Sequence, residues 1–162
     1  MDTLQLIVTA RELLADPTPL KTDCGILCGA ACCAPDEDGQ GGVWLFPGEE
    51  ALYRECGWAE IVNGDFAPML LCRGTCPRGE RPLACRFFPL SPCRNAAGQI
   101  AMRVDRRSRA MCPLSRSGRK AFDPAFAGTV RSAFRLMDRE KTLRAFLDAW
   151  ARKEAEFAQP FL

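Results

Sequence analysis

The chain has 162 residues, with ten cysteines, no histidine and a formal net charge of +2. A chain of this length can bury roughly 70% of the surface that its unfolded state exposes, so it does not need disulfides in order to fold. The lack of histidine excludes Ser-His-Asp and Cys-His hydrolases, Cys2His2 zinc fingers and HExxH proteases. With 48% apolar and 26% charged residues, the composition is that of an ordinary globular protein and predicts a single domain over residues 1–162.

The N-terminal segment indicates where the protein resides. Residues 1–16 have no basic start, no long apolar run and no small-residue cleavage site, so they do not resemble a secretion signal. No stretch approaches the roughly 18 consecutive apolar residues that a membrane span needs. We therefore expect a cytoplasmic protein with no membrane partner, in which the cysteines stay reduced and serve as metal ligands or redox groups.

The first half of the chain predicts short elements. An amphipathic helix is expected over residues 4–14, and residues 24–33 combine four cysteines with two glycines in a pattern typical of tight turns. A strand over 43–46 precedes one or two helical turns over 49–53. Asn63-Gly64 then predicts a small β-hairpin.

The second half predicts one more strand and two long helices. Residues 70–93 contain several prolines among four cysteines, which indicates a rigid, irregular loop region. A strand is expected over 100–104, after a turn at 95–98. Asp123-Pro124 is a good helix start, and the apolar spacing beyond it predicts two helices within residues 123–158.

Together these elements predict an α+β fold. Its first part, residues 20–115, is a small irregular cysteine-rich metal-binding half with short β-hairpins. An N-terminal helix and the two C-terminal helices of residues 123–158 support it.

The cysteines fall into two groups of candidate metal ligands. The first group is Cys24, Cys28, Cys32 and Cys33, and the second is Cys72, Cys76, Cys85, Cys93 and Cys112. Each group contains a Cys-x3-Cys pair, which is less specific than the Cys-x2-Cys knuckle of zinc ribbons. The density of cysteines in glycine- and proline-rich surroundings favours metal binding over the alternative, which is a set of packed free thiols.

Arginines accompany the second cysteine group. They are Arg73, Arg78, Arg81, Arg86 and Arg94. Such side chains can donate hydrogen bonds to metal-bound sulfur and balance its negative charge. The alternative for each one is a solvated loop arginine.

Three sequence strings carry a resemblance to a known family. CGILCGAACC (24–33), WLFPGEE (44–50) and LCRGTCPRGERPLACRFFP (71–89) resemble the YkgJ-type cysteine-cluster family, described as a zinc- or iron-chelating domain. The resemblance covers about residues 20–115. It implies a ligand set that consists of Cys24, Cys28, Cys32, Cys33, Cys72, Cys76 and Cys85. The Cys-Pro context adds Cys112 as an eighth ligand, with Cys93 in reserve, while Cys56 is expected to be a packed free thiol.

The predicted function is metal binding through clustered cysteine thiolates, without catalysis of its own. The cofactor is zinc or iron, because all-cysteine ligation suits both zinc sites and iron–sulfur clusters. One alternative is an iron–sulfur protein in electron transfer or as an accessory to a modifying enzyme, and a protein partner stays open. A second alternative is a zinc-stabilised nucleic-acid-binding module, suggested by the basic run over 103–120. Nucleic acid is not an expected partner, because the net charge is only +2 and no recognition-helix pattern occurs.

Overall fold

The N-terminal helix forms as its apolar spacing predicts. The computed structural model describes residues 1–22, 24–34 and 41–157, and its first element is α1 (Thr3–Leu13). The Asp2 carboxylate accepts a hydrogen bond from the Gln5 backbone N–H at 2.8 Å, and the Gln5 side chain accepts one from Asp2 N–H. This capping box satisfies two of the free N–H groups at the helix start.

The first cysteine segment consists of tight turns, as predicted. A single helical turn, α2 (Gly25–Cys28), is followed by Gly29 and Ala30, which both have left-handed backbone angles with φ of 61° and 56°. The short 3-10 helix Ala31–Cys33 comes directly after them. The two left-handed residues end the helical turn of α2, and the chain then enters the 3-10 helix that carries Cys32 and Cys33.

A three-stranded antiparallel sheet follows. Its strands β1 (Gly41–Trp44), β2 (Ala59–Asn63) and β3 (Pro68–Cys72) lie in the order β1-β3-β2, with β3 in the centre. The predicted strand over 43–46 therefore begins earlier and ends at Trp44. The predicted helical turns are the 3-10 helix Glu49–Leu52, which packs beside this sheet.

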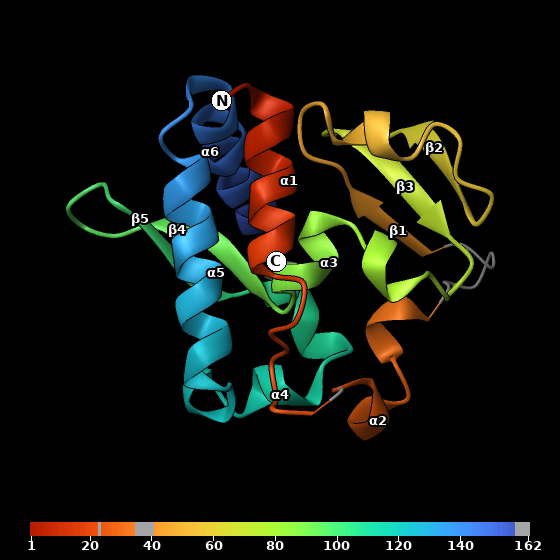
Figure 1. Cartoon of the computed structure of the whole chain (residues 1–162). Helices are drawn as coiled ribbons and strands as arrows, with labels where there is room; N and C mark the ends of the chain where they lie inside the picture. The colour runs from red at the N-terminus through yellow and green to blue at the C-terminus, as the bar shows by residue number, and fades with distance from the viewer. Residues whose placement is uncertain (23, 35–40, 158–162) are drawn as a thin grey trace.

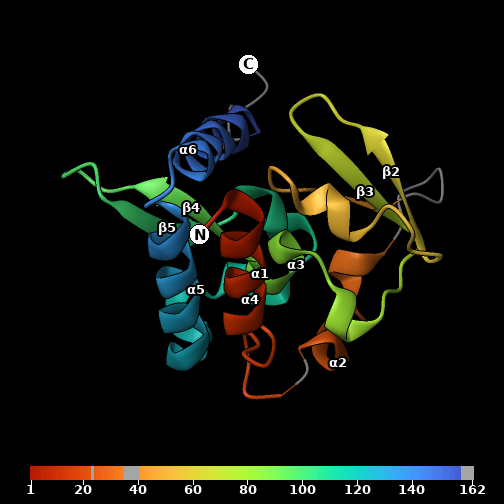
Figure 2. The ribbon, with the colours of Figure 1, turned by 45° about the horizontal axis from the view of Figure 1, so that its top comes forward.

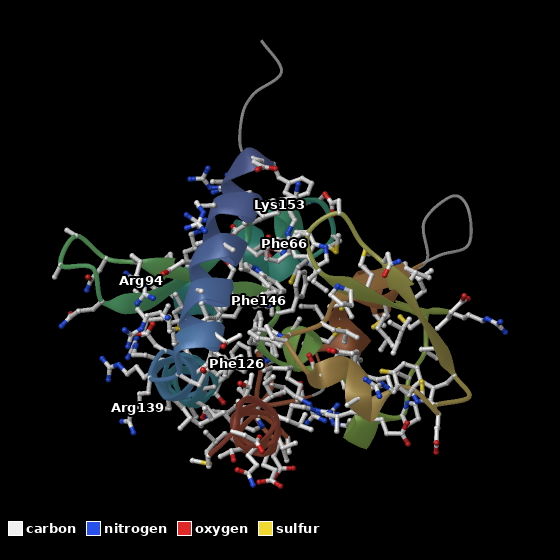
Figure 3. The ribbon with its side chains drawn as sticks, turned by 90° about the horizontal axis from the view of Figure 1, so that it is seen from above. Phe66, Arg94, Phe126, Arg139, Phe146 and Lys153 are labelled. Atoms are coloured by element: carbon white, nitrogen blue, oxygen red, sulfur yellow. The ribbon has the colours of Figure 1, made fainter. Side chains whose placement is uncertain are left out.

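The predicted hairpin joins β2 to β3, but its connection is longer than a two-residue Asn-Gly turn. Asn63 pairs with Pro68, so residues 64–67 form the loop. Gly64 is required there, because a Cβ atom would lie only 2.3 Å from the carbonyl oxygen of Ala67. Phe66 sits in this loop, and its ring stacks on that of Phe146 with centroids 5.1 Å apart. Both residues are labelled in Figure 3.

Residues 70–93 are more regular than predicted. They contain the end of β3, the short helix α3 (Leu83–Phe87) and most of β4 (Leu90–Arg94). β4 pairs with β5 (Ile100–Val104) in a separate two-stranded sheet, where the missing N–H of Pro92 is tolerated. The prediction of an irregular loop was wrong here because local composition does not reveal the pairing of β3 with β1 or of β4 with β5.

The C-terminal third is helical, as predicted. A short helix α4 (Pro113–Arg116) precedes α5 (Pro124–Met137) and α6 (Lys141–Glu156). The Asp123 carboxylate caps α5 by accepting from the Ala125 N–H at 3.1 Å. α5 packs against α1 and β5, while α6 lies across β4 (Figure 2). Residue 158, the last of the predicted helical region, lies outside the described residues.

The elements form an α+β fold, as the sequence predicts. In Figure 1 the three-stranded sheet and α2 lie on one side of α3, and the two-stranded sheet with α5 lies on the other. The main hydrophobic core gathers buried side chains from α1, α3, both long C-terminal helices and the end of β1. A smaller core of Leu45, Tyr53 and Leu70 lies under the three-stranded sheet. This smaller core packs against β3, which ends at Cys72.

Candidate metal centre

Five of the predicted ligands come together around one small pocket. They arise from three separate segments: Cys32 and Cys33 from the 3-10 helix, Cys72 and Cys76 from the end of β3 and the loop after it, and Cys85 from α3. The pocket has a volume of about 50 Å³, and Trp58, Leu70 and Arg81 also line it. A volume of this size suits an ion or a water molecule rather than an organic substrate.

The sheet register explains how Cys72 reaches the pocket. Cys72 is the last residue of the central strand, and it lies opposite Gly41 of β1 on one side and Ala59 of β2 on the other. Gly74, with φ of 84°, then turns the chain so that Cys76 returns toward the same pocket. A Cys-x3-Cys pair in this strand-and-turn context therefore presents both sulfurs on one side of the sheet.

A fully buried carboxylate fixes the helix that carries Cys85. Glu49 accepts hydrogen bonds from the Phe46 N–H at 3.0 Å and from the Leu83 N–H at 2.8 Å. Leu83 is the first residue of α3, so Glu49 ties this helix to the segment that follows β1. Sequence reasoning missed this role. The acidic pair after Gly48 is visible in the sequence, but nothing local to it indicates a partner 34 residues away.

Arg86 holds the loop that precedes Cys85. Its guanidinium donates to the carbonyl oxygens of Arg81 at 2.8 Å, Gly79 at 2.8 Å and Arg11 at 3.3 Å. The side chain is buried, with 8% of the residue surface exposed. Arg86 therefore acts on the backbone of the loop and not on sulfur, in contrast to the prediction.

Arg81, one of the arginines near the second cysteine group, lies against the cysteines of the pocket. It donates a side-chain hydrogen bond to Cys76 and lies close to Cys33 and Cys85. Burial opposes its charge, but the hydrogen bond to Cys76 and the nearby sulfurs raise the pKa of Arg81 above its ordinary value. Its cationic side chain thus favours the thiolate form of the nearby Cys85 sulfur, against the effect of burial.

The sulfurs influence one another strongly. Burial, followed by the neighbouring sulfurs of Cys33, Cys72 and Cys76, raises the pKa of the Cys85 thiol, and Arg81 opposes the shift. The pKa of Cys32 is raised chiefly by a hydrogen bond with Cys33, and the sulfurs of Cys85 and Cys24 add to the effect. Several thiols are therefore near enough that charge on one disfavours charge on the next.

The cysteine side chains around the pocket do not form a complete metal-coordination site in the described structure. Among the described residues, no three histidine, cysteine or carboxylate side chains stand in an arrangement that could hold a metal ion. The five cysteines share a pocket, but no three of their side chains are arranged to hold one ion as they stand.

The remaining candidate cysteines do not line the pocket, although the Cys24 sulfur is near enough to Cys32 to contribute to its raised pKa. Cys24 precedes α2 and packs against the main core, and the Cys28 Sγ donates to the Cys24 carbonyl oxygen at 3.8 Å. Cys93 lies on β4 opposite Ala101, in the sheet on the far side of α3. Cys112 precedes α4, and its N–H donates to the Ser108 carbonyl oxygen at 2.7 Å.

Cys56 has the surroundings of a packed thiol. It contacts the small core of Leu45, Tyr53 and Leu70, and its Sγ donates to the Ala59 carbonyl oxygen at 3.6 Å. It does not line the cysteine pocket. This position matches the prediction that Cys56 is a packed thiol, and it makes Cys56 a suitable control residue for experiments on the pocket.

No family model, curated protein or solved structure matches the chain. No helix in the described ranges is long and apolar enough to cross a bilayer.

Proposed function

We propose that this protein binds zinc or iron through cysteine thiolates, at the pocket formed by Cys32, Cys33, Cys72, Cys76 and Cys85. The observation that carries the proposal is the convergence of five cysteines from three distant segments on one pocket of about 50 Å³. Packed free thiols have no reason to gather in this way. Cys24, Cys28, Cys93 and Cys112 are further candidates from the sequence that this observation does not support.

The chemistry of the donor set fits such an ion. Thiolates are the preferred ligands of zinc and of iron–sulfur clusters. Arg81 supplies a hydrogen bond and a positive charge beside the sulfurs, as residues that surround the ligands do at many metal sites. Because the sulfurs do not share a centre as they stand, binding requires them to turn inward. Metal binding would then be coupled to local ordering of the three segments.

A structural role follows from this ligand set. An ion held by four sulfurs has no open position for water or substrate, so it would join the three segments without catalysing a reaction. Glu49 and Arg86 prepare the site by fixing α3 and the loop before it. The proposal includes a reducing compartment such as the cytoplasm, because the ligands must remain thiolates.

The basic run over 103–120 gives weaker support to nucleic-acid binding than its composition suggests. Arg103 forms an ion pair with the buried Glu154 at 3.2 Å, and Arg107 pairs with Asp105 at 2.6 Å. Both arginines therefore serve internal contacts. Absence of retention on a heparin column at physiological salt is the expected behaviour.

Anaerobic purification of the full chain, with metal analysis and an absorption spectrum, tests the proposal. Bound zinc with no visible band supports a zinc site, and a brown protein with acid-labile sulfide supports an iron–sulfur cluster. Cys85→Ser is expected to lose about one metal equivalent per chain, because a four-sulfur site depends on each ligand. Cys56→Ser is the matched control and should keep the full metal content.

Two results would contradict the proposal. One is a well-folded protein that contains no zinc or iron after anaerobic preparation and does not take either up when it is added. The other is full metal content in Cys85→Ser and also in Cys72→Ser, which would remove the pocket as the location of the metal.

A further inference from the structure

A second hollow lies between α5 and the two-stranded sheet. It has a volume of about 510 Å³ and shares no residue with the cysteine pocket. Its apolar floor consists of Leu90 from β4, Met102 from β5 and Phe122 from the segment before α5. Pockets of a few hundred Å³ with an apolar floor are the usual size for small organic ligands.

One face of α5 forms the wall of this crevice. The four helix residues that line it are Pro124, Ala127, Gly128 and Arg131. Their spacing of three, four and seven residues places them on one side of the helix. Gly128 lies in the middle of the helix, where glycine weakens the structure relative to alanine. A Cβ atom there would meet nothing within 4 Å, so close packing does not require the glycine. Small residues on this face keep the crevice open.

Two cations border the apolar floor. Lys120 and Arg131 are both exposed, and neither forms an ion pair or a side-chain hydrogen bond in the described part of the chain. No carboxylate among the described residues lines the crevice. The nearby Asp123 carboxylate is engaged in capping α5 through the Ala125 N–H. The positive end of the α5 dipole lies at the same border and also favours an anion.

We propose that this crevice binds a small amphipathic anion, with an apolar ring or short acyl chain on the floor and one acidic head group between Lys120 and Arg131. The apolar floor recognises the body of the ligand, and the two cations recognise its head. The arrangement disfavours a cationic ligand with the same body, because its head would meet two like charges.

A fluorescence titration of the full chain with anilinonaphthalene sulfonate tests this site, because the probe combines an apolar ring system with one anionic group. Saturable binding is expected, and octanoate should displace the probe at about tenfold lower concentration than the neutral octanol, as charge-assisted hydrogen bonds to its head group predict. Octylammonium should displace it least. Equal displacement by octanoate and octanol would overturn the proposal.

Variants locate the binding. Lys120→Gln with Arg131→Gln should weaken probe binding about tenfold, by loss of both charged contacts. Arg139→Gln with Lys141→Gln removes the same charge from exposed positions outside the crevice and should have no effect; Arg139 extends away from the body of the protein in Figure 3. Gly128→Trp, with its helical spectrum checked by circular dichroism, should abolish binding by filling the crevice.

Another control concerns Ile26, which is the most exposed aliphatic side chain in the part of the chain that the structure describes. Ile26 is 84% exposed and could attract the same probe. Ile26→Ser should leave the titration unchanged. If Ile26→Ser removes the signal, or if the Lys120 and Arg131 double variant binds as the wild type does, the crevice is not the binding site.

Discussion

Glu49 shows how one side chain can organise a site without touching it. It is fully buried, and both its oxygens accept backbone N–H groups, one beside the end of β1 and one at the start of α3. Burial is the main cause that raises the pKa of this carboxyl above 4.5, against the opposing effects of the two hydrogen bonds and of Arg11 and Arg86. Burial therefore makes Glu49 easier to protonate in the folded chain than in the unfolded chain.

This shift predicts a specific pH dependence of stability. Since the pKa of Glu49 is higher in the folded than in the unfolded chain, folding takes up a proton in the interval above pH 4.5. The contribution of Glu49 to the free energy of unfolding is fully present below that pH and falls as the pH rises through the folded pKa. The slope is at most about 1.4 kcal/mol per pH unit.

Glu49→Gln tests the assignment, because glutamine is neutral at every pH. Urea unfolding of both proteins at several pH values above 4.5 should show that the wild type loses stability relative to the variant as the pH increases. The comparison cancels the titration of the cysteines, which both proteins share. A constant difference between the two proteins across that range would mean that Glu49 is already ionised in the folded state.

At the scale of elements, an arginine that contacts two carboxylates joins the two-stranded sheet to the C-terminal helices. Arg94, at the end of β4, donates to Asp138 at 2.6 Å and to Asp148 at 2.7 Å. The two carboxylates raise the pKa of Arg94 above its ordinary value. Asp138 follows α5 and Asp148 lies in α6, so one side chain fixes the angle of both helices against the sheet (Figure 3).

Arg94→Ala should therefore destabilise the fold more than an ordinary surface substitution. We expect the free energy of unfolding to fall by about 1–2 kcal/mol, because two charge-assisted hydrogen bonds are lost from a partly buried position. Arg94→Lys should recover only part of this loss, since an ammonium cannot donate in the planar two-pronged geometry. Arg139→Ala is the exposed control. If thermal unfolding shows that Arg94→Ala and Arg139→Ala are equally stable, the contacts of Arg94 with the two aspartates contribute nothing to the stability of the fold.

The long helices could be predicted from the sequence, whereas β3 and the loop before it could not. α1, α5 and α6 are long and periodic, and their caps at Asp2 and Asp123 are visible in the sequence. β3 could not be recognised, because it is a short strand next to proline and glycine and its stability comes from β1 and β2 on either side. The four-residue loop after Asn63 was hidden for a related reason, since contacts of Phe66 with Trp44 and Phe146 fix that loop.

The sequence indicates that cysteines form the candidate site, but it does not indicate which of the cysteines lie together. Cysteine density indicated a metal, and five of the nine candidate ligands do share a pocket. The separation of Cys93 from them depends on the pairing of β4 with β5, on the far side of α3. Likewise, Arg81 and Arg86 look equivalent in sequence, yet one donates to sulfur and the other to three carbonyl groups.

At the scale of the whole molecule, a cluster of aromatic rings connects the cysteine-bearing part to the C-terminal helices. Trp150 of α6 lies 5.2 Å from Trp44 and 5.6 Å from Phe46 between ring centroids, and it also contacts Phe87 of α3. Arg107 lies over the rings of Trp44 and Trp150. Because the same rings belong to both parts, neither part has a core that is complete without the other.

This shared core predicts that the chain unfolds as one unit. Trp150→Ala should lower the free energy of unfolding by about 3–5 kcal/mol through the cavity that it leaves. Its unfolding curves should coincide when followed by fluorescence of Trp44 and Trp58, which lie in and beside the strands, and by far-ultraviolet circular dichroism, which is dominated by the helices. Separate transitions would mean that the helices form a domain of their own.

Trp150→Phe provides the matched comparison. The Trp150 Nε1–H is buried and has no hydrogen-bond partner among the described groups, so the indole pays a desolvation penalty that phenylalanine avoids. Phenylalanine keeps most of the ring contacts, and the loss should stay below about 1.5 kcal/mol. If Trp150→Phe is as damaging as Trp150→Ala, then the indole N–H has a partner, such as an ordered water, and the shared core depends on a polar contact as well as on packing.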